Sequence, residues 1–138
     1  MDPLFDRLHS LRAVPLFAGL STDDLVQLAE RAEVLELSEG AIVFRKGEAG
    51  RALYVVLSGE CTMHDGERLV SRMGAGELFG ELAVLDRAVR TATAVARGET
   101  RLLVLRDADV EEILATRPEA ARAVVAVLAA RLRASRRP

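Results

Sequence analysis

Between residues 33 and 105 the sequence consists of short apolar segments separated by glycines. The segments are EVLEL, AIVF, ALYVVLS, ECTMH, RLVSRM, TATAVA and RLLVL, and Gly40, Gly59 and Gly74 are among the glycines between them. Several short strands at a spacing of about 8–12 residues are typical of an antiparallel sandwich or barrel. The Asp-Gly pair in HDGERL indicates a tight turn between two of the strands. This region therefore predicts an antiparallel, jelly-roll-like β-roll.

Segments with helical periodicity precede the predicted roll. LFDRLHSLRAVPLF carries a stripe of leucines and ends at Pro15, and LSTDDLVQLAERAEVL follows it, with Ser21 or Thr22 as a candidate N-cap. Two acidic residues come directly after this cap, where they favour the positive end of a helix. We therefore expect N-terminal helices within residues 1–32.

Helical periodicity returns after the predicted roll. DADVEEILATR predicts a short helix capped by Asp107 and stopped by Pro118, and PEAARAVVAVLAARLRASRR predicts a longer one that begins at Pro118. On the longer helix one narrow apolar stripe is formed by Ala121, Val124, Val125, Leu128 and Leu132. We expect an α+β fold in which the β-roll of residues 33–105 is followed by two C-terminal helices in residues 106–138.

Composition limits the class of protein. A chain of 138 residues with 50% apolar residues is long enough for one folded domain, and a net charge of −2 gives no overall attraction to nucleic acid or anionic membrane. The single cysteine, Cys61, cannot form an internal disulfide and is expected to pack within a strand. No apolar run approaches the ~18 residues that span a bilayer. We expect one domain over residues 1–138, located in the cytoplasm and without direct membrane contact.

The segment GELFGELAVLDRAVRTATAV, residues 76–95, interrupts the strand pattern. Gly80 permits a sharp turn, and the five residues that follow it favour a short helix whose first N–H groups lack partners. Such a helix start attracts a phosphate, and Arg90 can bind two phosphate oxygens at once. Glu81 cannot bind an anion, but it can accept a hydrogen bond from a sugar hydroxyl, and Thr91 adds another hydroxyl. A phosphate, a ribose hydroxyl and an apolar wall together describe a mononucleotide site.

The same segment resembles the phosphate-binding cassette of the cyclic nucleotide-binding domain family, the catabolite-activator-type sensor domains. FGELAVLDRAVRTATAV matches the family pattern of Phe-Gly-Glu-Leu-Ala followed by a spaced arginine. The likeness extends to VPLFAGLSTDDLVQLAE, EGAIVFRKGEAGRALYVVLSGE and RLLVLRDADVEEILATRPEAA, and so covers residues 13–133. One departure is Val89, which stands where a proline commonly precedes the arginine.

The resemblance implies roles for residues of the cassette, residues 79–93. Arg90 would bind the cyclic phosphate and Glu81 the ribose 2′-hydroxyl. Backbone N–H groups around Leu82, Ala83 and Ala92 would complete the phosphate cradle, and Gly80 would let the backbone come close to the ligand. Thr91 stands where the family carries Ala, Ser or Thr, and a hydroxyl there is often associated with tolerance of guanine. For the base, Met63 is a candidate contact that is equally well explained as a core methionine. Arg131 on the last helix is a candidate lid residue that is equally well explained as a solvated arginine.

The resemblance also implies a regulatory function. The ligand would be cyclic AMP, favoured over cyclic GMP, and it would close the C-terminal helix over the pocket without any further cofactor. The domain is similar to the sensor domains of bacterial cyclic nucleotide-gated potassium channels. A channel or transporter parent is therefore compatible with the sequence, as is a homo-oligomer.

Three other functions fit the sequence less well. An enzyme is disfavoured because His9 and His64 are isolated, so that no metal site or nucleophile–base pair can be assembled from them. DNA binding is disfavoured because the basic ending RLRASRRP offers no recognition helix. A degenerate domain that binds only protein remains the alternative, in which Glu81 and Arg90 merely pair with neighbours.

Overall fold

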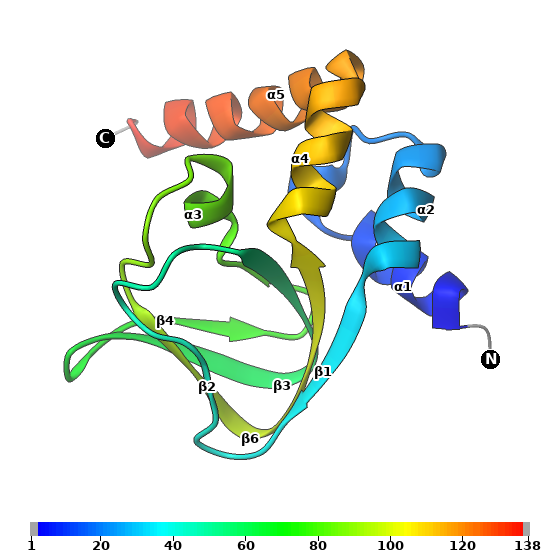
Figure 1. Ribbon diagram of the computed structural model, residues 1–138. Coiled ribbons are helices and arrows are strands. Elements are labelled where there is room, and N and C mark those ends of the chain that lie inside the picture. Colours follow the sequence, from blue (N-terminus) through cyan, green and yellow to red (C-terminus); the bar gives the residue numbers. More distant parts are fainter. Residues whose placement is uncertain (1–2, 137–138) are drawn as a thin grey trace. The chain divides into compact units, whose positions relative to one another are not determined.

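The computed structural model describes residues 3–136 (Figure 1). The predicted ranges 1–32 and 106–138 also include residues 1–2 and 137–138, which lie outside the described residues. Two compact units are formed. One contains the residues up to Arg31 and from Ala108 onward, and the other extends from Ala32 to Asp107.

The unit from Ala32 to Asp107 is built on an antiparallel sheet of six strands. The strands run in the order β1-β6-β3-β4, while β2 also pairs with β6 and β5 with β3. Their bounds are β1 (Glu33–Leu37), β2 (Ile42–Phe44), β3 (Ala52–Asp65), β4 (Arg68–Gly74), β5 (Leu78–Phe79) and β6 (Thr93–Arg106). The sheet, with helices before and after it in the sequence, confirms the predicted α+β class with an antiparallel roll.

Two of the predicted strand breaks are wrong. Residues 52–58 and 60–64 belong to one continuous strand, β3, and residues 93–96 and 101–105 belong to β6. Gly59 and Gly98 lie inside these strands with φ of 84° and 69°, and the β3–β6 register shifts on both sides of Ser58. A Cβ on Gly59 would lie 2.5 Å from the carbonyl oxygen of Glu99. These glycines therefore accommodate bulges and close approach of the strands, without ending them.

The two faces of β3 have different neighbours. Cys61 and Met63 are buried in the sheet's hydrophobic core, as predicted for the cysteine. Thr62 and His64 alternate with them and therefore point to the opposite face. One core cluster of this unit contains Phe44, Val56, Cys61, Met63, Phe79, Ala94 and Leu102.

The helical unit contains α1 (Pro3–Arg12), a short 3₁₀ helix η1 (Pro15–Phe17), α2 (Thr22–Arg31), α4 (Asp107–Thr116) and α5 (Pro118–Ser135). Ser21 is the N-cap of α2, because its Oγ accepts a hydrogen bond of 3.1 Å from the amide of Asp24. Asp107 is the first residue of α4, one position later than a cap would stand. Among the described helices none is both long enough and apolar enough to cross a bilayer.

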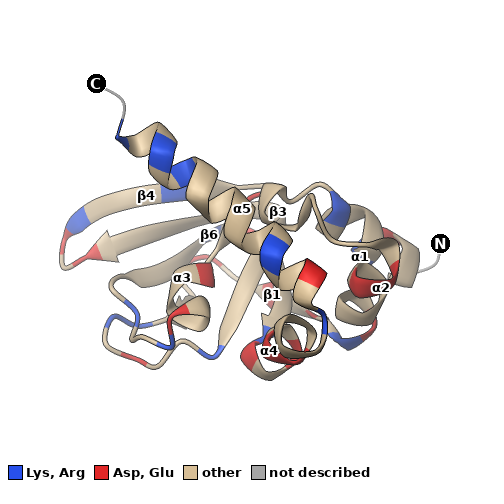
Figure 2. Cartoon of the chain, turned by 90° about the horizontal axis from the view of Figure 1, so that it is seen from above, with Lys and Arg blue, Asp and Glu red and all other residues tan. Residues whose placement is uncertain are grey.

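The apolar stripe predicted on α5 is buried only in part. Val124 is buried as expected, whereas Val125 and Leu132 are 61% and 55% exposed. The helix carries Glu119 in its first turn and arginines toward its end, an order that suits the helix dipole (Figure 2).

Candidate functional site

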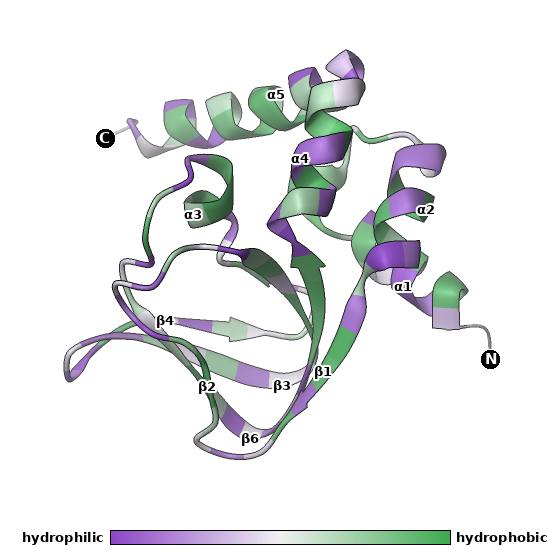
Figure 3. Cartoon of the chain, in the orientation of Figure 1, coloured by the Kyte–Doolittle hydropathy of each residue, from purple (hydrophilic) through white to green (hydrophobic). Residues whose placement is uncertain are grey.

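Gly80 sets the start of α3 (Glu81–Leu85), the single short helix within the sheet unit. Its φ of 81° lies in the left-handed region, and a Cβ there would lie 2.8 Å from Nη1 of Arg90. Most of α3 is hydrophobic (Figure 3), and Ala83 faces Gly50 closely. A Cβ on Gly50 would lie 2.4 Å from Cβ of Ala83. Glycine is therefore required at position 80, directly before α3, and at position 50, which packs against it.

The loop after α3 is held by backbone hydrogen bonds to residues 47–50. The amide of Gly47 donates to the carbonyl of Arg90 over 2.8 Å, and the amide of Arg90 donates to the carbonyl of Glu48 over 2.7 Å. The amide of Gly50 donates to the carbonyl of Ala88 over 3.2 Å. These bonds fix the position from which the Arg90 side chain enters the fold.

Two consecutive residues shape the middle of this loop. The side-chain Oδ1 of Asp86 accepts a hydrogen bond of 3.1 Å from the amide of Ala88. Arg87, which lies between Asp86 and Ala88, has a φ of 56°, and it is the one non-glycine residue with positive φ among residues 3–136. The loop therefore contains one strained position.

The guanidinium of Arg90 is buried against backbone oxygens and aromatic rings. The residue is 4% exposed; its Nη1 donates to the carbonyl of Gly80 over 2.7 Å, and its Nη2 donates to the carbonyl of Ala52. Its Cζ lies 4.1 Å from the ring centroid of Phe44. Burial lowers the pKa of Arg90, and interaction with Tyr54 partly opposes that shift. The charge is therefore held in the fold at a desolvation cost.

Arg90 retains unused binding capacity. Its Nε is buried and has no hydrogen-bond partner among residues 3–136, and no ion pair to Arg90 is present in that range. Glu48 and Glu81 raise the pKa of Arg90 only through longer-range attraction. A buried cation that contacts neutral carbonyls and has a spare N–H is poised for an anion.

Arg90 lines a cavity of about 340 Å³, within the range of small-molecule sites of about 300–1,000 Å³. Eight of the nine residues predicted for ligand binding line it: Gly80, Glu81, Leu82, Ala83, Arg90, Thr91, Ala92 and Met63. The ninth, Arg131, lies on α5 in the helical unit, so its lid role stays a prediction. The remaining lining residues are Phe44, Val70, Ser71, Met73, Phe79, Asp86, Ala88 and Val89.

The cavity combines charged and apolar surfaces. Arg90, Glu81 and Thr91 come from the cassette, whereas Phe44, Met63 and other apolar side chains come from the strands. Such a cavity can hold a small anion that carries hydroxyl groups and a flat apolar ring. Val70 and Ser71 could not be predicted from the sequence as lining residues, because no motif marks them and the direction of their side chains depends on the pairing of β4 with β3.

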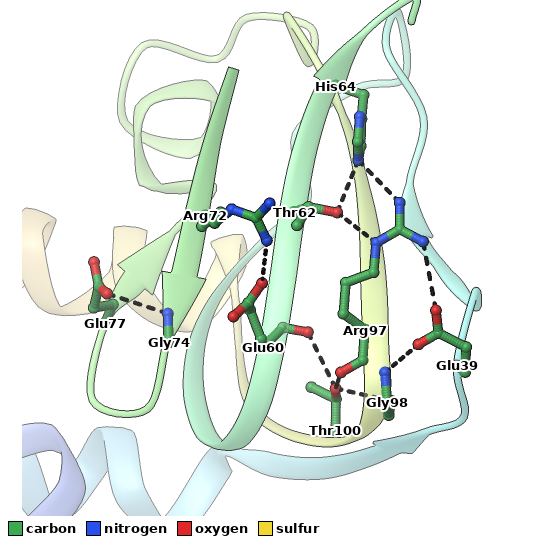
Figure 4. A network of polar contacts seen from close by, with 10 residues as sticks. All are labelled: Glu39, Glu60, Thr62, His64, Arg72, Gly74, Glu77, Arg97, Gly98 and Thr100. Carbon is green, nitrogen blue, oxygen red and sulfur yellow. Dashed lines mark hydrogen bonds and ion pairs between the residues drawn. The ribbon is translucent and has the colours of Figure 1, made fainter. Parts of the chain in front are cut away.

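A second polar cluster lies on the Thr62 side of β3 (Figure 4). Nε of Arg97 donates to Oγ of Thr62 over 3.0 Å, while Nε2 of His64 lies 2.8 Å from that oxygen and 3.2 Å from Nη2 of Arg97. Glu39 forms an ion pair with Arg97 over 3.6 Å. His64 therefore belongs to a hydrogen-bond network and is not isolated. Within the described residues no three His, Cys, Asp or Glu side chains converge as a metal site.

Comparison with known proteins yields close sequence relatives. The Cyclic AMP receptor protein of Thermus thermophilus is 36% identical over 128 residues, which cover 89% of this chain and 59% of the relative. A cyclic nucleotide-gated potassium channel of Rhizobium etli is 32% identical over 112 residues, covering 81% and 31%. The chain thus spans less than two thirds of the length of these relatives.

Solved structures agree with the sequence comparison. The N-terminal domain of a transcriptional regulator from Streptomyces coelicolor A3(2) superimposes with a TM-score of 0.81 at 35% identity, covering 92% of this chain and 94% of that one. The regulatory domain of Toxoplasma gondii PKA, solved with cAMP, gives a TM-score of 0.75 at 32% identity, covering 80% and 44%.

The family model for the cyclic nucleotide-binding domain matches residues 34–117, which is more than half of the chain and includes the whole sheet from β2 onward. The cavity, its buried arginine and the cassette all fall within this range. The chain therefore belongs to the cyclic nucleotide-binding domain family.

Proposed function

We propose that the cavity binds a 3′,5′-cyclic nucleotide and that the domain acts as a regulatory sensor. The observation that carries the proposal is the buried guanidinium of Arg90, which lines a cavity and has no ion-pair partner among residues 3–136. A cyclic phosphate carries one negative charge and would supply the missing counter-charge.

The roles of the other cassette residues follow from the same placement. Glu81 accepts the hydrogen bond of the ribose 2′-hydroxyl, and the amides of Leu82, Ala83 and Ala92 contact the phosphate. Gly80 keeps the backbone close to the ligand, and Thr91 offers a hydroxyl to either nucleotide. Support comes from their common position around one cavity.

Cyclic AMP is the favoured nucleotide. The support is that one relative carries cyclic AMP in its name and that one similar structure was solved with it. The relatives also include a channel and transcriptional regulators, so control of a channel, transporter or other effector in the cytoplasm is part of the proposal.

Isothermal titration tests the binding. Wild-type protein is titrated with cyclic AMP, with cyclic GMP and with 5′-AMP, which has the same base and ribose but an open phosphate monoester. We expect binding of cyclic AMP and much weaker binding of 5′-AMP. Glu81→Ala removes one hydrogen bond and should cost about 1–3 kcal/mol. Flat titrations with both cyclic nucleotides on folded protein would favour a domain that binds only protein.

The C-terminal helix is proposed to close on the ligand, with Arg131 as its lid residue. A ligand shifts such an equilibrium only by its differential affinity for the closed form. Amide hydrogen exchange of residues 119–135 with and without nucleotide measures the response. Increased protection at saturation is expected, and unchanged protection would count against closure.

A further inference from the structure

The exposed apolar residues of α5 follow a coiled-coil pattern. Val125 and Leu132 lie seven positions apart and are both exposed, and Leu128 lies between them and is partly buried. With Ala121 one turn earlier, the successive spacings are four, three and four residues. This alternation keeps the side chains on one side of a helix and is the spacing of the a and d positions in a coiled coil. We call Ala121, Val125, Leu128 and Leu132 the α5 seam.

The α5 seam differs from the side of the helix that packs within its own unit. Val124 is buried, and a Cβ on Gly19 would lie 2.7 Å from Cβ of Ala123. Successive helix residues point about 100° apart, so Val124 and Arg131, which are seven positions apart, share a direction that is not that of the seam. A partner on the seam therefore does not compete for the side of α5 that carries the proposed lid residue.

The charged residues that border the α5 seam are all arginines. In the heptad pattern Arg122 and Arg136 occupy e positions and Arg131 occupies a g position, which are the positions beside a and d. No Asp or Glu occurs among residues 120–138, and Figure 2 shows arginines without acidic residues along α5 after its first turn. Charges at e and g decide which helix can pair with a seam. The border of this seam is therefore basic.

The basic border argues against a second copy of this chain as the partner. In a parallel pair of α5 helices, Arg131 of one copy would lie beside Arg136 of the other. In an antiparallel pair, Arg122 would lie beside Arg136. Either arrangement places like charges together as the apolar residues meet, whereas carboxylates on a different helix would be attracted at the same positions.

We propose that the α5 seam docks an acidic amphipathic helix of a partner protein as a two-stranded coiled coil. The apolar side chains of the partner cover Val125 and Leu132, and its carboxylates pair with Arg122 and Arg136. The seam is only about two heptads long, so the complex is weak and reversible. The inference does not use the nucleotide cavity and is independent of the proposed function.

Two fluorescently labelled peptides test the inference. Each has about three heptads, with Ile at a and Leu at d; one carries Glu at e and g and the other carries Lys there. The peptides are titrated with the nucleotide-free 138-residue protein, and binding is followed by fluorescence anisotropy at low and high salt. We expect the acidic peptide to bind at least about tenfold more tightly than the basic one, and salt to reduce the difference.

Three variants at exposed positions locate the binding surface. Leu132→Ser shortens the seam and should weaken binding of the acidic peptide at least about fivefold. Arg122→Glu should weaken binding of the acidic peptide and strengthen binding of the basic one. Ala130→Glu is the matched control, because it places a carboxylate on the side of α5 opposite the seam and should change both affinities less than about twofold.

The results distinguish the partner from other occupants of the seam. Failure of the acidic peptide to bind, equal binding of the two peptides, or binding that survives both Leu132→Ser and Arg122→Glu overturns the proposal. A dimer in sedimentation velocity that Leu132→Ser dissociates assigns the seam to a second copy. Flotation with phosphatidylglycerol vesicles that depends on Leu132, without binding of the acidic peptide, assigns it to a membrane. Either assignment overturns the proposal, and circular dichroism shows that each variant keeps its helices.

Discussion

Arg90 and Arg97 lie seven positions apart in sequence, but their side chains lie on opposite sides of β3 and have different partners. Arg90 lines the cavity on the Met63 side, and its hydrogen bonds go to backbone carbonyls. Arg97 lies on the Thr62 side, where it contacts the side chains of Thr62, His64 and Glu39. Among residues 3–136, Arg97 has a carboxylate partner in Glu39 and Arg90 has none.

The difference separates a binding group from a structural one. The charge of Arg97 is compensated by Glu39, and its Nε bonds the hydroxyl of Thr62. Arg90 is more deeply buried, has only neutral acceptors and keeps an unpaired Nε within the described chain. Burying such a charge costs folding free energy unless an anion pairs with it. The sequence singled out Arg90 through its place in the cassette, but it gave no indication that Arg97 pairs with Glu39.

Exchanging each arginine for alanine gives the largest expected contrast. Arg90→Ala should weaken cyclic AMP binding at least about a hundredfold, roughly 3 kcal/mol, since the cyclic phosphate loses its counter-charge. Arg97→Ala should change the affinity less than about threefold. Titration calorimetry on both variants, checked for folding by circular dichroism, measures the contrast. Similar losses of cyclic AMP affinity in the two variants would contradict the distinction between a binding arginine and a structural one.

Cys61 on the cavity side of β3 makes stability depend on alkaline pH. Burial, with a smaller contribution from Glu60, raises the pKa of the Cys61 thiol from about 9 to about 11. The folded protein keeps the proton that the unfolded chain releases, so the stabilisation is complete below about pH 9 and is lost as pH rises through 11. The loss should be roughly 2–3 kcal/mol.

Denaturant unfolding between pH 8 and 11 measures this dependence. Cys61→Ala serves as the control, because it lowers stability at every pH but should flatten the slope. An unchanged slope in that variant would assign the alkaline loss to other groups.

On the opposite face, Thr62→Val tests the polar network. Thr62 is 2% exposed, and its hydroxyl joins Nε of Arg97 to His64. The isosteric change leaves these groups without that partner and should lower the free energy of unfolding by about 1–2 kcal/mol. Nucleotide affinity should stay within about twofold of wild type. A large affinity loss would show that this face contributes to the site.

The smallest effect is expected in the cassette loop at Arg87. Glycine adopts the φ of 56° there without a steric penalty, whereas alanine, like the native arginine, adopts it at a cost because of its Cβ. Both changes remove the arginine side chain, so Arg87→Gly should be about 0.5–1 kcal/mol more stable than Arg87→Ala in denaturant unfolding. Equal or reversed stability would show that the loop relaxes when the side chain is removed.

Local patterns predicted much of the site. Gly80, the helix formers after it and the spaced Arg90 predicted the turn, the short helix and the arginine entering from the next segment, and the structure contains all three. Local pattern failed at Gly59, which was predicted to separate two strands, and around Gly98, which lies between two segments that were predicted as separate strands. A glycine in a bulge and a glycine in a turn have the same local signature, and only the pairing partner distinguishes them.

Tertiary contacts account for the rest. Nothing near Arg90 in the sequence indicates that its Nη2 donates a hydrogen bond to the carbonyl of Ala52, the first residue of β3. The direction of Ser71 depends on the bulge at Val70, which follows from the β3–β4 register. The role of His64 required Arg97 to be brought beside it by β3–β6 pairing.

The missing side chain of Gly50 also sets a rule for protein engineering. A methyl group there would overlap Ala83, and the amide of Gly50 is bonded to the carbonyl of Ala88. The short helix α3 and its loop are therefore held by contacts with residues 47–50, some thirty residues earlier in the sequence. Transplanting the cassette into a different scaffold would require residues 47–50 to be moved with it, because α3 and its loop pack against these residues and bond to them.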